Sequence, residues 1–191
     1  MYPASSASTR PRVPPEHELS TTKPLPGAAR GETMNVQYIN PFIESVSELF
    51  TTMFQKSATR GNIGTSKSVG ENQDVVAMIG ITGDVQGSVA VAMSEQTALK
   101  VVGSLLGCDI DEFGSDATDG VAEVVNMIAG GAKAKLPSQG LSPLQLSLPT
   151  VLRGKDFVVT YPTQSLWLDI PFESELGSFH LRVTLKNAQN N

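Results

Sequence analysis

The chain has 191 residues, a formal net charge of −5 and 40% hydrophobic residues, which suffices for one globular domain with a hydrophobic core. No apolar run approaches the roughly 18 residues that span a bilayer, and the N-terminus lacks the charged-then-apolar order of a secretory signal, so we expect a cytoplasmic protein. The single cysteine, Cys108, cannot form an intramolecular disulfide. Together with His17 and His180 it does not provide enough ligands for a Cys/His zinc site.

The first 33 residues differ in composition from the rest of the chain. They hold six of the twelve prolines and scarcely an aliphatic cluster, so they cannot offset the entropy of ordering by burial. We therefore expect a disordered leader rich in Pro, Ser and Thr over residues 1–33, followed by a single domain over 34–191. Because Met34 begins the apolar pattern, we also expect it to be the natural start of the protein.

The predicted domain is acidic, since residues 34–191 carry 10 Lys and Arg against 16 Asp and Glu. It contains no cluster of basic residues interleaved with aromatic ones, so nucleic acid is not an expected partner. The negative charge also disfavours binding to anionic membranes.

The first predicted helix covers residues 34–54. Its apolar side chains recur every three or four residues, Asn40 can cap its start, and Pro41 suits its first turn. Residues 64–94 predict three strands, because they are rich in β-branched side chains and contain a turn at Gly83-Asp84.

Two further helices are predicted in the middle of the chain. Ser94 is the expected N-cap of the first of them, which Gly107 ends. A polar, acidic connector then leads to a helix over 119–136, whose start Thr118 or Asp116 can cap.

The C-terminal part predicts strands, because β-branched and alternating apolar residues return over 147–154, 155–162, 164–174 and 177–186. The last two are expected to form a hairpin through residues 175–177. The order of helix, strands, two helices and strands predicts an α+β fold of two layers, with a largely antiparallel β-sheet and helices packed on one side.

The helix over 119–136 carries the most informative pattern. At about 100° per residue, Asp119, Glu123 and Asn126 fall within one narrow stripe. The opposite face is apolar, with Val121, Val124, Val125, Ile128 and Ala132. The helix is therefore expected to pack by its valines and to present two carboxylates and an amide. Spacing alone does not establish a site, because every amphipathic helix has a polar face.

Other candidate groups are weaker. His180 alternates with apolar residues in a predicted strand and is interpreted as structural or surface, and the acidic residues after Cys108 disfavour its thiolate. The glycines of 80–87 join strand to strand, so they do not form a phosphate loop. The chain thus lacks a nucleophile, histidine base, cofactor loop or metal cluster of its own. Any catalysis must use reactivity that the substrate supplies.

Three segments resemble the CheX family of bacterial chemotaxis proteins, within the CheC, CheX and FliY group of phosphatases. They are MNVQYINPFIESV, IGITGDVQGSVAVAMSEQTA and DGVAEVVNMIAGGAKAKL, and the resemblance runs from residue 34 to about residue 187. Asp119, Glu123 and Asn126 match the group's signature of Asp or Ser, three residues, Glu, two residues, Asn. Only one such signature falls on a predicted helix, which agrees with CheX rather than with the two-site CheC pattern.

The resemblance implies a phosphatase that hydrolyses the aspartyl phosphate of a CheY-type response regulator. Asn126 would enter the regulator's active site and orient the attacking water, and Glu123 would pair with its lysine. Asp119, Gly130 and Lys133 would support the site or bind the partner. No cofactor of its own is expected, since the Mg²⁺ ion would belong to the regulator. The resemblance also implies a homodimer.

Two other interpretations remain open at this stage. The same helix could bind a response regulator or a flagellar-switch component without accelerating hydrolysis. Alternatively, the protein could be a scaffold whose polar stripe is only solvated, which a buried or occluded stripe would favour.

Overall fold

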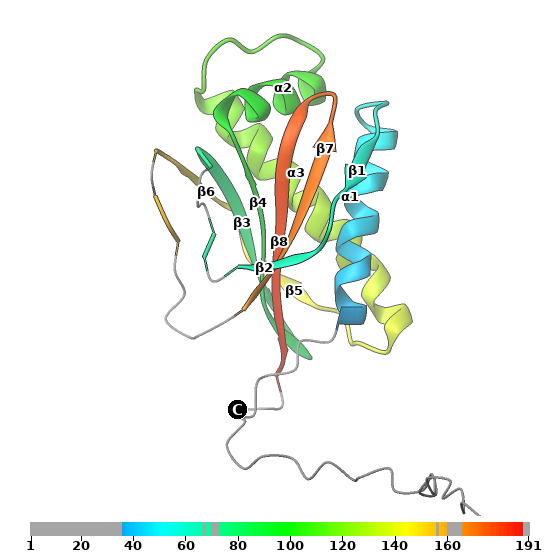
Figure 1. Ribbon diagram of the computed structural model, residues 1–191. Coiled ribbons are helices and arrows are strands. Elements are labelled where there is room, and N and C mark those ends of the chain that lie inside the picture. The colour runs from blue at the N-terminus through cyan, green and yellow to red at the C-terminus, as the bar shows by residue number, and fades with distance from the viewer. Residues whose placement is uncertain (1–35, 67, 70–72, 156, 160–165, 189–191) are drawn as a thin grey trace, which may run out of the picture. The chain divides into compact units, whose positions relative to one another are not determined.

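The computed structural model describes residues 36–66, 68–69, 73–155, 157–159 and 166–188 (Figure 1). They belong to one compact unit of the chain, Glu32–Asn191. The predicted leader over residues 1–33 lies outside the described residues, so its disorder stays a prediction. None of the helices among the described residues is long and apolar enough to cross a membrane.

Eight strands form one sheet in the order β1-β7-β8-β4-β3-β5, with β2 also beside β7 and β6 also beside β3. Its long strands are β3 (Val75–Thr82), β4 (Val85–Met93), β7 (Trp167–Ser174) and β8 (Gly177–Asn187). Its short outer strands are β1 (Ala58–Arg60), β2 (Gly64–Ser66), β5 (Gln145–Leu146) and β6 (Thr150–Arg153). The pairings are antiparallel, and β7 and β8 form the predicted hairpin.

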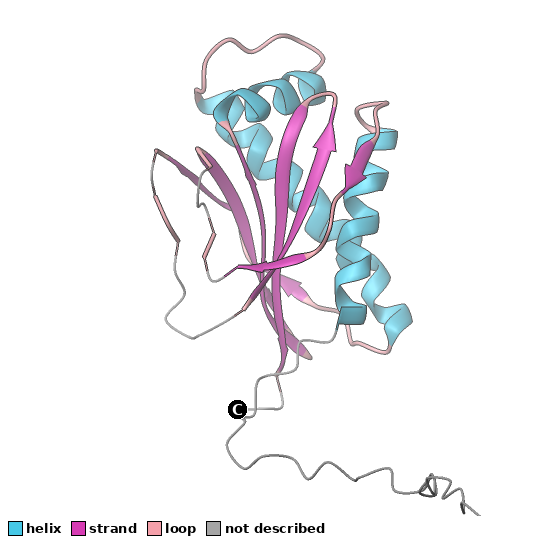
Figure 2. Ribbon diagram, in the orientation of Figure 1, coloured by secondary structure: helices cyan, strands magenta, loops and turns pink. Residues whose placement is uncertain are grey.

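Three α-helices cover one face of this sheet, namely α1 (Asn40–Thr52), α2 (Glu95–Leu106) and α3 (Ser115–Lys135). Figure 2 shows the cyan helices gathered to one side of the magenta strands. Phe179, Leu181 and Val183 of β8 alternate toward the helices and join the main hydrophobic core with the valines of α3. The predicted α+β fold, with a largely antiparallel sheet and helices on one side, is confirmed.

The opposite face of the sheet carries a smaller buried cluster that includes Trp167 of β7. Val69 is buried in this cluster, and the partly buried Phe157 and Val159 pack against it. Val69 and Val159 also form an isolated antiparallel bridge. Among its described residues, the predicted strand over 155–162 contributes only this bridge.

Helix ends follow the prediction at α2 and depart from it at α1. Ser94 caps α2 by accepting a hydrogen bond of 3.2 Å from the backbone N–H of Thr97, and Gly107 ends the helix in the left-handed region with φ 71°. The predicted Asn40 cap of α1 is wrong. A 3-10 turn, η1 (Val36–Ile39), runs directly into this helix, so Asn40 already lies inside a helical chain, although Pro41 does occupy the first turn.

Helix α3 begins at Ser115, earlier than the sequence predicts. Its N-cap is Gly114, which has no side chain, so the predicted capping by Thr118 or Asp116 is wrong. Thr118 lies inside the helix and donates its hydroxyl to the carbonyl of Gly114 at 2.9 Å. Asp116 lies in the first turn, where its carboxylate interacts favourably with the positive end of the helix dipole.

Two glycines let α3 approach its neighbours closely. A Cβ atom on Gly120 would overlap the side chain of Val102 on α2, and one on Gly131 would lie 2.8 Å from the hydroxyl of Ser45 on α1. By contrast, a Cβ atom on Gly130 would meet nothing within 4 Å. Gly120 and Gly131 therefore serve internal packing, whereas Gly130 does not.

The same substitution should have opposite effects at these glycines. Gly120→Ala is expected to lower the free energy of unfolding by about 1–3 kcal/mol, because the methyl group overpacks the contact with Val102. Gly130→Ala should raise it by up to about 1 kcal/mol, because alanine has the higher helix propensity and the space is open. Urea unfolding of both variants measures the difference, and equal effects would contradict this packing of α2 on α3.

Candidate functional site

The candidate site is the exposed face of α3. Asp119, Glu123 and Asn126 are exposed, while the valines and small residues of the opposite face are buried against the core. The partly exposed Gly130 and Lys133 extend the same stripe, since Gly130 follows Asn126 by four residues and Lys133 follows Gly130 by three. We call the surface formed by these five residues the α3 stripe. The predicted register of the helix is confirmed.

Helix α3 is held at both ends, so the α3 stripe lies on a fixed element. Near its start, Gly120 fits against α2, and near its end Gly131 fits against α1. The ammonium of Lys135 lies 2.6 Å from the carboxylate of Glu48 on α1 and 3.9 Å from that of Glu44. These pairs are partly exposed and contribute little individually, so close packing fixes the position of the helix.

Within the α3 stripe, the side chains of Glu123 and Asn126 contact one another. The amide Nδ2 of Asn126 donates to Oε2 of Glu123 at 3.3 Å, between residues one helical turn apart. Sequence reasoning assigned a separate partner to each residue and missed this bond. Their spacing of three residues could have predicted it, because such side chains are neighbours on a helix.

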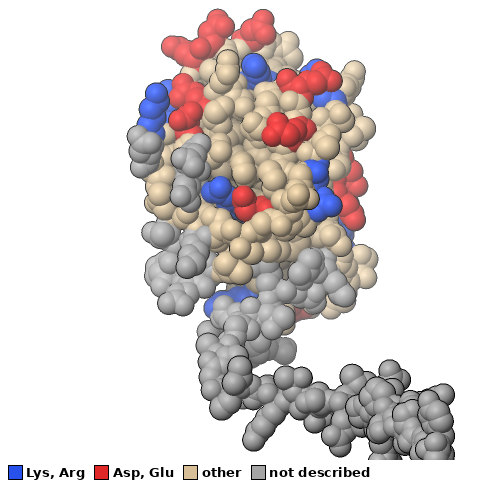
Figure 3. Space-filling model, viewed as in Figure 1, with Lys and Arg blue, Asp and Glu red and all other residues tan. Residues whose placement is uncertain are grey.

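The α3 stripe lies on the solvent-exposed face of its helix. A hollow of the described surface lies instead at the connection between α2 and α3, where its lining includes Lys100, Cys108 and Asp109 but no residue of the α3 stripe. The connection also carries exposed carboxylates, and Figure 3 shows Asp and Glu gathered at this end of the molecule. An exposed helix face suits a protein partner better than a small-molecule substrate, which binds in a concave site.

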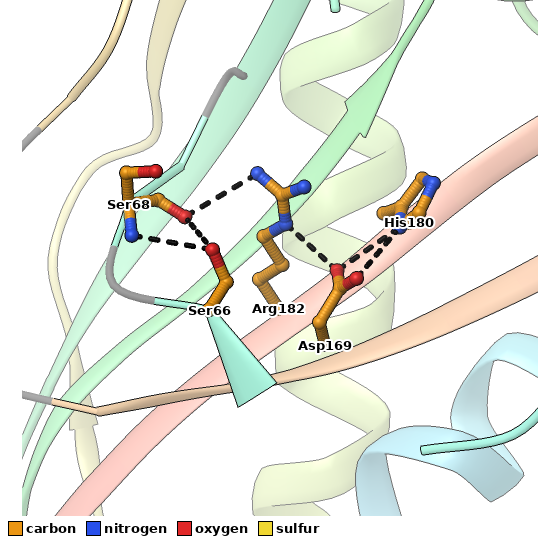
Figure 4. Close-up of polar contacts among 5 residues, drawn as sticks. All are labelled: Ser66, Ser68, Asp169, His180 and Arg182. Atoms are coloured by element: carbon orange, nitrogen blue, oxygen red, sulfur yellow. Dashed lines mark hydrogen bonds and ion pairs between the residues drawn. The ribbon is translucent and has the colours of Figure 1, made fainter. Parts of the chain in front are cut away.

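His180, the histidine of the predicted C-terminal strand, belongs to a polar cluster on the opposite face of the sheet (Figure 4). Its Nδ1 lies 3.0 Å from Oδ1 of Asp169 on β7, and Nε of Arg182 donates to the same oxygen at 2.7 Å. Arg182 also donates to the carbonyl of Ser68 at 3.4 Å. The cluster ties β7 and β8 to the chain after β2, which supports the interpretation of His180 as a structural residue.

Burial raises the pKa of Asp169, but the hydrogen bonds from His180 and Arg182 and the charge of Arg182 outweigh it and hold the pKa below its usual range. Sequence reasoning did not identify this cluster. The register of the β7–β8 hairpin, which places Asp169 opposite Arg182, is the signal that could have found it.

The remaining candidates also have structural explanations. Residues 80–87 include the turn between β3 and β4, where Gly83 has φ 136°, so they form a hairpin as predicted. Cys108 is exposed next to the end of α2. Within the described part of the chain, no group of three or more His, Cys, Asp or Glu side chains is placed to hold a metal ion.

Comparisons with known proteins agree with this fold. The family model for the chemotaxis phosphatase CheX matches residues 75–173, which include α2 and α3. The CheY-P phosphatase CheX of Thermotoga maritima is 30% identical over 155 residues, which cover 81% of this chain and 99% of that protein.

Two solved structures extend this agreement. The chemotaxis protein CheX of Desulfovibrio desulfuricans is 33% identical with a TM-score of 0.69, covering 78% of this chain and 99% of that one. The CheX–CheY–BeF3–Mg²⁺ complex of Borrelia burgdorferi matches at 24% identity and a TM-score of 0.66, over 80% of this chain and 100% of that one, and bears on the fold alone. These matches define a protein with the fold of the CheC-like and CheX-like chemotaxis proteins. More narrowly, the chain belongs to the CheX family.

Asp169→Asn should destabilise the protein by about 1–3 kcal/mol at pH 7, because it removes the charge partner of the buried Arg182. The pKa of Asp169 is lower in the folded state than in the unfolded state, so its contribution is present above the unfolded value of about 3.9 and is lost as the pH falls through the folded value. The difference from wild type should therefore shrink toward pH 3. Urea unfolding at both pH values measures it.

The exposed Glu173 on the same strand provides a control, and Glu173→Gln should change stability little. A loss in Asp169→Asn that stayed constant from pH 7 to pH 3 would contradict an electrostatic role for the cluster.

Proposed function

We propose that this protein is a phosphatase that accelerates hydrolysis of the aspartyl phosphate of a CheY-type response regulator in chemotaxis or related two-component signalling. Membership of the CheX family and the activity of the Thermotoga maritima relative support this function. The observation that carries it is the α3 stripe, where Glu123 and Asn126 stand exposed on a firmly packed helix. A site with so few functional groups can support catalysis only if the substrate supplies the reactive bond and the remaining catalytic groups.

The proposed mechanism inserts α3 into the active site of the phosphorylated regulator. The regulator supplies the acyl phosphate, its own Mg²⁺ ion and a lysine, so the phosphatase contributes mainly position and charge. This chain needs no cofactor of its own in that mechanism. The Borrelia burgdorferi structure is a complex of CheX with CheY, BeF3 and Mg²⁺, which supports a CheY-type partner.

In the reaction, the oxygen of water forms a bond to phosphorus while the bond from phosphorus to the aspartate oxygen breaks. The bonding electron pair returns to the aspartate as its carboxylate. One proton of the water stays on the attacking oxygen, and the other passes to another oxygen of the phosphate product. Asn126 cannot act as a base near neutral pH, but its amide can accept a hydrogen bond from the water and hold it in line. Glu123 pairs with the regulator's lysine.

The other residues of the α3 stripe are assigned supporting roles. Asp119 and Lys133 are charged groups at the two ends of the stripe and contact the partner's surface. Gly130 leaves open space one turn after Asn126. Because a helical side chain leans toward the N-terminus of its helix, a side chain longer than that of alanine at this position would extend toward Asn126. Gly130 therefore gives the regulator room to approach the amide.

The protein is further proposed to act in the cytoplasm as a homodimer, with residues 34–191 as the phosphatase domain and residues 1–33 as a disordered leader. Joining the sheets edge to edge through the short outer strands would hide unpaired backbone groups. Those strands are β1 and β2 beside β7, and β5 and β6 beside β3.

A binding module that docks on a regulator or a flagellar-switch component without hydrolysis is the alternative. The presence of an exposed Asn126 at the position of the signature favours the enzyme, since docking alone does not require an amide there. The scaffold interpretation depended on a buried or occluded stripe. Its residues are exposed or partly exposed, so this alternative gains no support.

Asn126→Ala should reduce the rate of aspartyl-phosphate hydrolysis by about 100-fold, because the water loses its positioning group. Binding to the phosphorylated regulator should remain close to that of wild type. Phosphate release from a panel of phosphorylated receiver domains measures the rate, and titration with a regulator carrying BeF3 measures the binding.

The removal of one exposed amide should leave the fold intact, and a thermal unfolding curve close to that of wild type provides the control. Hydrolysis by Asn126→Ala at the wild-type rate would contradict the mechanism. A wild-type protein that binds regulators without accelerating hydrolysis of any of them would establish the binding module instead.

A further inference from the structure

We infer that Glu123 has a second role in catalysis, namely to orient the amide of Asn126 so that its carbonyl oxygen faces the attacking water. Glu123 is then a positioning residue as well as the partner of the regulator's lysine. The inference rests on the proposed phosphatase function and adds to it a cause for the geometry of the catalytic amide.

The hydrogen bond between the two residues fixes which end of the amide points outward. An ionised carboxylate only accepts hydrogen bonds, so it can bind only the NH₂ group of Asn126. The contact of 3.3 Å from Nδ2 to Oε2 of Glu123 therefore leaves Oδ1 turned away from the carboxylate. Because Oδ1 accepts a hydrogen bond from the water, it directs a lone pair of the water oxygen toward phosphorus. The reversed amide would donate to that lone pair and oppose the attack.

No other described group performs this task. In the described part of the chain, the amide of Asn126 has no hydrogen-bond partner besides Glu123. The next position on the α3 stripe toward the C-terminus is Gly130, which offers no side chain and has open space around it. Without Glu123, the exposed side chain of Asn126 would rotate freely, and the correct amide orientation would be one of several.

Glu123 can serve both partners at once because its carboxylate has two oxygens. Oε2 accepts from Asn126, and Oε1 remains available for the ammonium of the regulator's lysine. In the free protein the bond is exposed and weak. Docking excludes water from the surface of α3, which strengthens the bond where the geometry of the amide matters.

The two roles of Glu123 can be separated by comparing kcat with KM. Glu123→Gln removes the charge and leaves an amide that can accept from Asn126 or donate to its Oδ1, so it restricts Asn126 less strictly than the carboxylate does. KM should rise by about 10-fold and kcat should fall by about threefold. Glu123→Ala removes both functions, so kcat should also fall by about 10-fold. Rates of phosphate release are measured over a range of phosphorylated regulator concentrations up to saturation.

A double-variant cycle tests whether the effect on kcat passes through Asn126. In the Asn126→Ala background there is no amide to orient, so adding Glu123→Ala should lower kcat no further while still raising KM. The control Glu173→Ala removes an exposed carboxylate from β7 and should change neither constant. Unfolding curves of all variants check that the fold is retained.

The outcomes distinguish this inference from the proposed function. If the wild-type protein accelerates no hydrolysis, the proposed function fails. If it does, the inference fails when Glu123→Ala retains the wild-type kcat at saturation, when Glu123→Gln loses as much kcat as Glu123→Ala, or when the losses in the double variant are additive. A smaller loss of kcat in Glu123→Gln than in Glu123→Ala, together with non-additive losses, supports it.

Discussion

The structure depends on the burial of one face of α3. Val121, Val124, Val125 and Ile128 pack into the main core, and each buried aliphatic side chain contributes about 1.5–3 kcal/mol. This burial fixes the rotation of the helix about its axis. Since a rotation by one residue would expose valines and bury carboxylates, the direction in which Glu123 and Asn126 point follows from the packing of the side chains on the buried face of the helix.

The sheet supports this helix through its two different faces. Alternating residues of β8 place Leu181 and Val183 under the helices, while His180 and Arg182 point to the other side, where they meet Asp169. A charged group on the helix side would be buried without a partner at a cost of several kcal/mol. The apolar pattern therefore determines the register of the hairpin, and the polar cluster stabilises that register from the outside.

Periodicity predicted the long elements because burial imposes it: the valines of α3 and the alternation in β8 follow from facing one core. The sequence did not predict where α3 begins, because the N-cap residue is Gly114, which has no side chain to mark the helix start. Thr118, an expected cap, lies inside the helix. The short strands β1 and β5 were also missed, since two or three residues show no period. The stripe could be placed from spacing, but its roles came from family resemblance, because exposed polar residues alone do not distinguish a site from a solvated face.

A phosphatase with so small a site is possible when the catalytic groups are divided between two proteins. In the proposed mechanism the regulator holds the reactive acyl phosphate, the metal ion and the lysine, so the phosphatase has only to place one water in line, a task that positioning can perform. An amide on a long flexible side chain would place it poorly. The short side chain of Asn126 has few rotamers, and Glu123 restricts them further. In that mechanism the rigidity of α3, fixed by Gly120 against α2 and by Gly131 against α1, is part of the catalytic apparatus, because a movement of the helix would displace the attacking water.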